Sequence, residues 1–187
     1  MPQLPLVLAF LLSIVLMATP ARAWELSGSK VIKVHVRDEQ PVTIGMLTFA
    51  PVADGSSSYS VALDHARFTD HFLSMKEFKC LSGGGEVTCH VPYPYPHART
   101  VTPANLAWLE HELLFLFKLP NEFGAKLWNG LYFQLRLTEQ GLVGTPQAID
   151  LNLISSPPAK PDVPPYRKAL RDDITPGSRW ITSITIE

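Results

Sequence analysis

The chain has 187 residues, of which 46% are hydrophobic, and a formal net charge of −1. That size suits one domain with a substantial core, and the absence of a clustered basic face argues against a nucleic-acid partner. The 17 prolines exclude a mostly helical protein, because proline interrupts helices.

Residues 1–23 have the features of a secretory signal peptide. Leu6–Ala18 is apolar and uncharged, and Ala21-Arg22-Ala23 provides the small residues that a signal peptidase reads. The apolar run is shorter than the roughly 17 to 25 residues of a membrane-spanning helix, although the usual basic start is missing. We therefore predict cleavage after Ala23 and export of a single domain, residues 24–187, to the periplasm or the exterior. No membrane span would remain; a retained anchor and a buried helix are the alternatives.

Alternating apolar and polar residues predict strands in the first part of the exported domain. In Val31–Arg37 every second residue is apolar, which is typical of a half-buried strand. Val42–Ala50 is apolar on both faces, so we expect it inside the sheet. Tyr59–Leu63 is predicted as a short strand after a polar turn.

Two Asp-His pairs, Asp64-His65 and Asp70-His71, are the best candidates for chemistry, and all four residues are also predicted to contact a ligand or a partner. A carboxylate and an imidazole together bind a divalent metal or relay protons. On a strand, however, the two histidines would lie about 20 Å apart, so a shared metal requires a turn between them. The alternative interpretation is two polar turns flanking Phe68, and both a helix and a bent strand fit this segment.

The chain has two cysteines, Cys80 and Cys89, which flank the glycine-rich turn 83–85. In an exported protein this even count predicts a disulfide across a hairpin. Free thiols are the alternative. A metal site is disfavoured because no further ligands complete it, and a redox pair because the spacing is not Cys-x-x-Cys.

The prolines of Pro92-Tyr93-Pro94-Tyr95-Pro96 predict an extended, polyproline-like run rather than a central strand. Tyr93, Tyr95 and the following His97 are predicted to contact a ligand or a partner, because rigid aromatic side chains lose little entropy on binding. Packing of both tyrosines against the sheet is the alternative.

One main helix is predicted over about 103–118. Thr102 suits the N-cap, Pro103 suits the first helical position, and leucines recur at helical spacing. Within it, Glu110-His111-Glu112 is interpreted as a solvated face. The segment lacks the second histidine of a zinc-protease helix, because residue 115 is Phe.

Three further strands are predicted at Leu131–Leu137, Leu142–Leu153 and Trp180–Ile186. Residues 155–166 contain five prolines and are predicted to form a stiff surface linker. About eight strands, mostly in hairpin order, predict an α+β fold that is mostly antiparallel β, as a curled meander or a partly closed β-barrel.

No esterase elbow, phosphate loop, dinucleotide fingerprint or calcium loop is present. We therefore predict no catalytic residue, no cofactor and no metal. The leader, the cysteine pair and the strands predict a small non-catalytic module of a bacterial envelope, which binds an apolar ligand or an envelope protein. An Asp/His hydrolase, with or without a metal, and a structural part of an envelope or secretion assembly are the alternatives.

Overall fold

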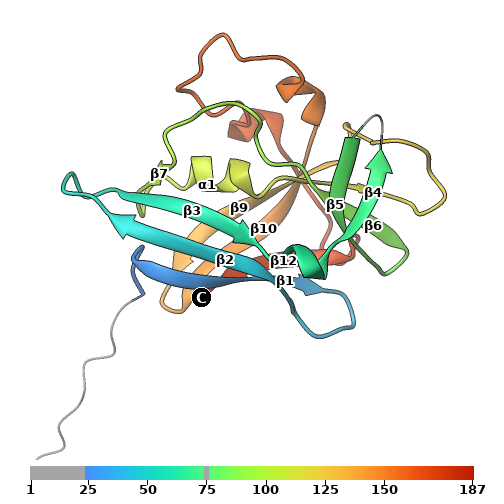
Figure 1. Cartoon of the computed structure of the whole chain (residues 1–187), viewed down its shortest axis with the longest axis horizontal. Helices are drawn as coiled ribbons and strands as arrows, with labels where there is room; N and C mark the ends of the chain where they lie inside the picture. Colours follow the sequence, from blue (N-terminus) through green and yellow to red (C-terminus); the bar gives the residue numbers. More distant parts are fainter. Residues whose placement is uncertain (1–23, 74–75) are drawn as a thin grey trace, which may run out of the picture.

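The computed structural model describes residues 24–73 and 76–187, so the predicted leader lies outside the described residues. The strands form one antiparallel sheet in the order β4-β5-β6-β8-β9-β10-β12-β1-β2-β3-β7, with β11 paired to β10 (Figure 1). They are β1 (Gly28–Val36), β2 (Val42–Pro51), β3 (Ser57–Leu63), β4 (Thr69–Leu73), β5 (Lys76–Gly83), β6 (Glu86–His90), β7 (Thr100–Val101), β8 (Phe115–Lys118), β9 (Gly130–Thr138), β10 (Gly141–Ile149), β11 (Asp172–Asp173) and β12 (Ile181–Ile186).

The α+β class with mostly antiparallel strands is confirmed, but the eight-stranded barrel is not. Among the described residues the sheet has 12 strands and two ends, β4 and β7, so it is curled but not closed. Two of the additional strands, β7 and β11, are short pieces that pair only two residues each, whereas β4 pairs five residues and β8 pairs four. Strands of two residues form because a neighbouring strand provides hydrogen-bonding partners. They are too short to show an alternation of apolar and polar residues in the sequence.

The predicted helix over 103–118 is wrong in length. The α-helix α1 spans only Ala107–Glu112, and its expected start is a turn in which Thr102 pairs with Asn105. Phe115–Lys118 is the strand β8, hydrogen-bonded between β6 and β9. A short run that is apolar on all sides fits a buried strand as well as a helix. Here the run is a strand, because β6 and β9 provide hydrogen-bonding partners on both sides.

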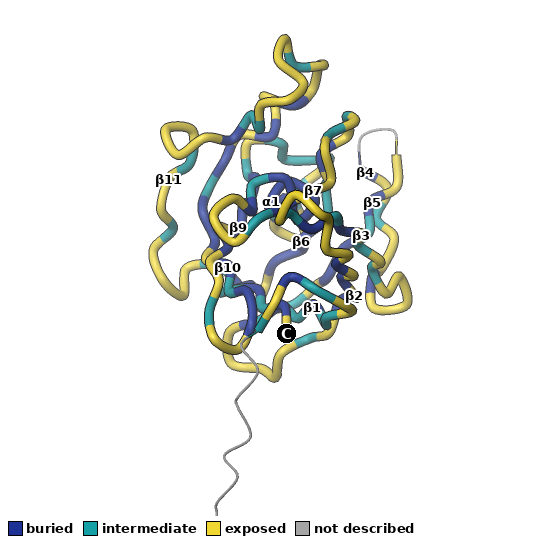
Figure 2. Tube along the Cα trace, turned by 90° about the vertical axis from the view of Figure 1, so that its left-hand side faces the viewer, coloured by how far each residue is buried: buried dark blue, intermediate teal, exposed yellow. Residues whose placement is uncertain are grey.

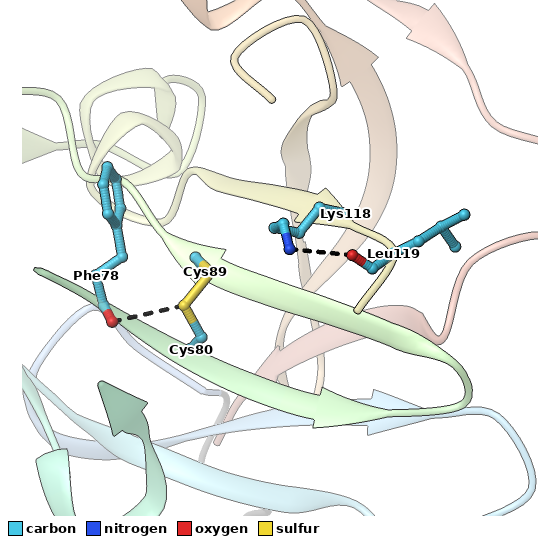
Figure 3. The surroundings of a disulfide bond; sticks show 5 residues. All are labelled: Phe78, Cys80, Cys89, Lys118 and Leu119. Atoms are coloured by element: carbon cyan, nitrogen blue, oxygen red, sulfur yellow. Dashed lines mark hydrogen bonds between the residues drawn. A yellow bond between two sulfur atoms is a disulfide. The ribbon is translucent and has the colours of Figure 1, made fainter. Parts of the chain in front are cut away.

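The glycine-rich hairpin β5–β6 and its disulfide are confirmed. Cys80 lies directly opposite Cys89 across the two strands (Figure 3). Gly84 and Gly85 form the two-residue turn, each with a positive φ (55° and 79°) that favours glycine. A Cβ on Gly84 would come within 2.4 Å of Trp180, so glycine also lets this indole pack on the turn.

The two ends of the domain meet in the middle of the sheet. β12 lies between β10 and β1 and pairs with both. Ile184 and Ile186 are fully buried as their alternation predicts, and Ile181 is buried too, because the register shifts by one residue opposite Val36. β2 lies between β1 and β3, inside the sheet as its composition predicts.

The first half of strand β9 is covered on both faces. Leu131, Phe133 and Leu135 are buried as predicted, and so is Tyr132, which the alternation would place on the polar side. The helix α1 packs on β9, and the proline-rich segment 155–171 passes over the same region (Figure 1, top). The part of the chain that the structure describes also contains three 3-10 turns: η1 (His65–Arg67), η2 (Leu151–Ile154) and η3 (Lys168–Leu170).

Candidate functional site

The run 92–97 alternates between the interior and the surface. Tyr93 is buried, whereas Pro92 and Pro94 are exposed. The N–H of Tyr93 donates to the carbonyl oxygen of His111 at 2.9 Å. This bond fixes the run to α1 and leaves the two prolines on its outer side.

Tyr95 and His97 also pack inward. The Tyr95 ring lies edge-on to Tyr93, with 5.5 Å between ring centroids. His97 stacks on Trp108 at 4.7 Å, and its side chain is only 2% exposed. The three side chains predicted as contacts thus form an aromatic cluster with α1, and their role in binding a ligand or partner stays a prediction.

The outer side of the same run contributes to an apolar groove of about 230 Å³. The start of β5, the loop 119–129 between β8 and β9, and η2 form the rest of the groove. This loop and the strands β4 and β5 lie on the right of Figure 1. The lining residues are Lys76, Phe78, Val91, Pro92, Pro94, Ala125, Leu127, Leu151, Ile154 and Ser155. All but Lys76 and Ser155 are apolar. The groove is smaller than the roughly 300 to 1,000 Å³ of a site that encloses a drug-sized ligand, so it suits a short apolar chain or one or two side chains.

Large apolar side chains are exposed on the segments that form the groove. Phe123 is 94% exposed and Trp128 61% exposed in the loop 119–129, and Leu153 of η2 is 51% exposed. The ammonium of Lys126 lies 5.3 Å from the Trp128 ring. Exposed apolar side chains on segments that also line an apolar groove are typical of a surface that binds another molecule.

The prediction that Glu110-His111-Glu112 faces solvent is wrong, because all three residues are buried. The helix α1 lies in the interior of the domain (Figure 2), between β9 and the segment 155–171. A single amphipathic pattern cannot show that a second layer of chain covers the polar face of a helix.

Glu110 holds α1 to β9. One carboxylate oxygen accepts a hydrogen bond from the Tyr132 hydroxyl, and the other accepts from the N–H of Leu135 at 2.7 Å. Burial raises the pKa of Glu110 above its usual range. The guanidinium of Arg171 lies 4.5 Å from the Tyr132 ring and covers this pair from the side of the proline-rich segment.

His111 holds α1 to the proline-rich segment. Its Nδ1–H donates to the carbonyl oxygen of Ala107 at 2.7 Å, and its Nε2 accepts from the N–H of Tyr166 at 3.2 Å. The Tyr166 ring stacks on the imidazole at 5.5 Å. Burial lowers the pKa of His111 to about 4, so the imidazole is neutral at pH 7, as the acceptor role of Nε2 requires.

Glu112 joins α1 to the segments on its other side. Its carboxylate oxygen Oε1 lies 2.9 Å from His97 Nε2 and 3.2 Å from Arg99 Nη2. Its carbonyl oxygen lies 2.8 Å from Nε2 of His90, whose pKa is lowered by burial. The contacts of α1 therefore fasten chain segments together, and they place the run 92–97 so that Pro92 and Pro94 face the groove.

The Asp-His pairs lie elsewhere. Asp64 accepts a hydrogen bond from the N–H of Ala66 at the start of η1 and pairs with Arg67 at 3.5 Å. His65 lies in η1, exposed, and His71 lies on β4. Asp70, also on β4, pairs with Lys79. None of the four residues lines the groove, and no group of three or more His, Cys, Asp or Glu among residues 24–73 and 76–187 could hold a metal.

The groove was not predicted from the sequence, because its residues come from four segments that converge only in the folded chain. The one available signal was local. Phe123 and Trp128 lie in a segment rich in turn-forming residues, which indicates a surface loop. Such a loop has no core of its own in which large aromatic side chains could be buried.

No family model, no curated protein and no solved structure matches this chain. In the part of the chain that the structure describes, no helix has the length and apolar character to cross a bilayer.

Proposed function

We propose that this chain is an exported, non-catalytic module of a bacterial envelope that binds an apolar ligand or an apolar segment of a protein partner. The observation that carries the proposal is the apolar groove formed by β5, the run 92–97, the loop 119–129 and η2. Displacing water from apolar surface favours binding by roughly 25 cal/mol per Å².

The walls of the groove are held in place without a ligand. The disulfide joins β5 to β6 two residues beyond Phe78 (Figure 3), and Tyr93 anchors the opposite wall to α1. A preformed site loses less conformational freedom on binding, which supports recognition as the task of this surface.

Export is supported by two independent features. The leader predicts it, and the Cys80–Cys89 disulfide is of the kind that persists in oxidising compartments such as the periplasm. Expression of the whole chain in a bacterium, followed by mass measurement of the periplasmic fraction, tests this part of the proposal. We expect an N-terminus at Trp24 and a mass two hydrogens below that of the reduced chain.

The groove is tested with a neutral fluorescent probe, N-phenyl-1-naphthylamine. Ala125→Trp fills the groove, and we expect it to weaken probe binding at least tenfold. Ala169→Trp is the matched control, because Ala169 is exposed on η3 away from the groove. Equal binding to both variants, or no binding to the unaltered protein, would contradict the proposal.

A structural role in an assembly is the second candidate, and the exposed Phe123 and Trp128 favour it. It predicts an oligomer that dissociates when both residues are replaced by serine, as measured by light scattering after size exclusion. A monomer at high concentration argues against it. The hydrolase alternative has no such support, since Asp64 and Asp70 are engaged by Arg67 and Lys79.

A further inference from the structure

The first residues of β5 pair on one side only. Lys76–Lys79 pair with β4, whereas the pairing with β6 begins at Cys80. Beyond His90 the chain leaves the sheet as the run 92–97, whose prolines lack the N–H groups that a strand needs. The sheet therefore has a notch beside the start of β5, at the position of the groove.

The disulfide pair indicates which backbone groups face this notch. Cys80 and Cys89 have Cα atoms only 3.9 Å apart, as in the narrow pair of an antiparallel ladder, where the two residues exchange no hydrogen bonds. Because the pattern alternates along a strand, the N–H and C=O of Glu77 also point to the β6 side. Among the described residues, no backbone hydrogen bond joins Glu77 to the chain beyond β6.

The charge at the groove is positive. Lys76 lines it, and its ammonium lies 4.9 Å from the centroid of the Phe78 ring. Within residues 24–73 and 76–187 this ammonium forms no ion pair, whereas the neighbouring Lys79 is paired with Asp70. A cation held on an aromatic ring beside an apolar surface complements an acidic group.

We propose that the groove binds an extended segment of a protein partner, which pairs with Glu77 as an added strand. This inference rests on the proposed function and deepens it. Side chains two apart on a strand face the same way, so the segment places apolar side chains in the groove and an acidic side chain near Lys76. Strand addition of this kind combines main-chain hydrogen bonds with pockets for alternate side chains.

Two observations favour a peptide over a small apolar ligand. A hydrocarbon offers nothing to the N–H and C=O of Glu77, whereas a peptide backbone satisfies both. The exposed Phe123 and Trp128 lie outside the groove lining, and a protein partner is large enough to cover them together with the groove. Aromatic side chains are enriched at protein interfaces.

The test is a selection of random nine-residue peptides on the purified, disulfide-bonded protein, with the Ala125→Trp protein used to remove non-specific binders. We expect the enriched peptides to alternate apolar residues and to carry at least one Asp or Glu. Lys76→Glu should weaken the best peptide at least tenfold. Lys168→Glu makes the same charge change on η3, outside the groove lining, and should leave the affinity unchanged.

Hydrogen exchange followed by NMR measures directly whether the bound peptide pairs with the backbone of Glu77. The best peptide should slow exchange of the Glu77 amide at least tenfold, and N-phenyl-1-naphthylamine should not. Enriched peptides without alternation, an unchanged Glu77 amide, or protection of the outer edge of β4 instead would overturn the inference. So would the absence of any enriched peptide; if the naphthylamine probe still binds, the proposed function stands, and if the probe fails as well, both fall.

A membrane is the remaining occupant to test. Sedimentation with phosphatidylglycerol vesicles, abolished by Phe123→Ser with Trp128→Ser, would assign the exposed aromatics to lipid and overturn the inference. We expect no sedimentation of the unaltered protein.

Discussion

His111 shows how a residue with an exposed-looking pattern becomes part of the core. Its neighbours in sequence are acidic, yet its ring is fully buried between Tyr166 and Tyr132. Both ring nitrogens have partners, and the Nε2 contact requires the neutral form. The protonation state of one side chain is therefore coupled to the position of the proline-rich segment.

The unfolding free energy should fall as the pH is lowered from about 6.5 to about 4, and His111 should account for part of that fall. The folded state keeps the imidazole neutral down to a pKa of about 4, whereas the unfolded chain takes up the proton near pH 6.5. The stabilisation is thus present above pH 6.5, and roughly 3 kcal/mol of it is lost by pH 4. Urea denaturation between pH 4 and pH 8 measures this.

His111→Gln is the control, because glutamine does not titrate. The variant will be less stable at every pH, but its pH dependence should be shallower by the same roughly 3 kcal/mol. Glu110, whose pKa is raised, acts in the opposite direction and is common to both proteins. Parallel curves for the two proteins would refute the assignment.

At the level of elements, the proline-rich segment 155–171 acts as a strap over α1. Tyr166 anchors it: the ring is 2% exposed, and the hydroxyl donates to the carbonyl oxygen of Asp150 at 3.0 Å. The prolines stiffen the chain on the way to this anchor. The strap in turn completes the burial of α1.

Tyr166→Ala should release the strap. We expect a loss of about 3 to 5 kcal/mol in unfolding free energy, as for other large-to-small changes in a core, and faster proteolytic cleavage within 155–171. Tyr166→Phe keeps the ring and should cost only about 0.5 to 1.5 kcal/mol. Cleavage at equal rates in all three proteins would show that the strap is held by other contacts.

The disulfide acts on the element that forms one wall of the groove. Replacing Cys80 and Cys89 together by serine removes the covalent link that closes a short loop in the unfolded chain. The chain-entropy model then gives a loss of about 2.5 to 3 kcal/mol in unfolding free energy. Because the notch lies beside β5, we also expect weaker binding of the naphthylamine probe. Denaturant melts and probe titrations measure the two effects; unchanged probe binding would show that β4 alone positions the wall.

For the whole molecule, the pairing of β12 with β1 and β10 is decisive. β12 separates β10 from β1, and its three isoleucines are fully buried. Deleting residues 181–187 should therefore abolish cooperative folding rather than fray one edge, with loss of near-ultraviolet circular dichroism. Glu187→Gln removes only the surface ion pair with Lys33 and keeps the backbone hydrogen bonds to Val31, so it should cost less than about 1 kcal/mol. A cooperative melt after the deletion would contradict this view.

Much of the sheet could be predicted from local patterns, and the site could not. Val31–Arg37 and Leu131–Leu137 alternate clearly, and both are strands. The run Leu113–Phe117 is apolar throughout, so its period does not separate helix from strand, and the prediction of a helix was wrong there. The groove depends on four segments far apart in the chain, and no local pattern encodes their meeting.

The sequence by itself determined the antiparallel class, the stapled hairpin and the inward side of most strands, because these follow from side-chain alternation, turn glycines and cysteine spacing. Tertiary structure alone decided that α1 is short and enclosed, that Tyr93 faces inward while Pro92 and Pro94 line a groove, and that the start of β5 lacks a second neighbour. The physical reason is the range of the interactions. Local propensities act over a few residues, whereas burial and strand pairing are settled by whichever distant segments the chain brings together.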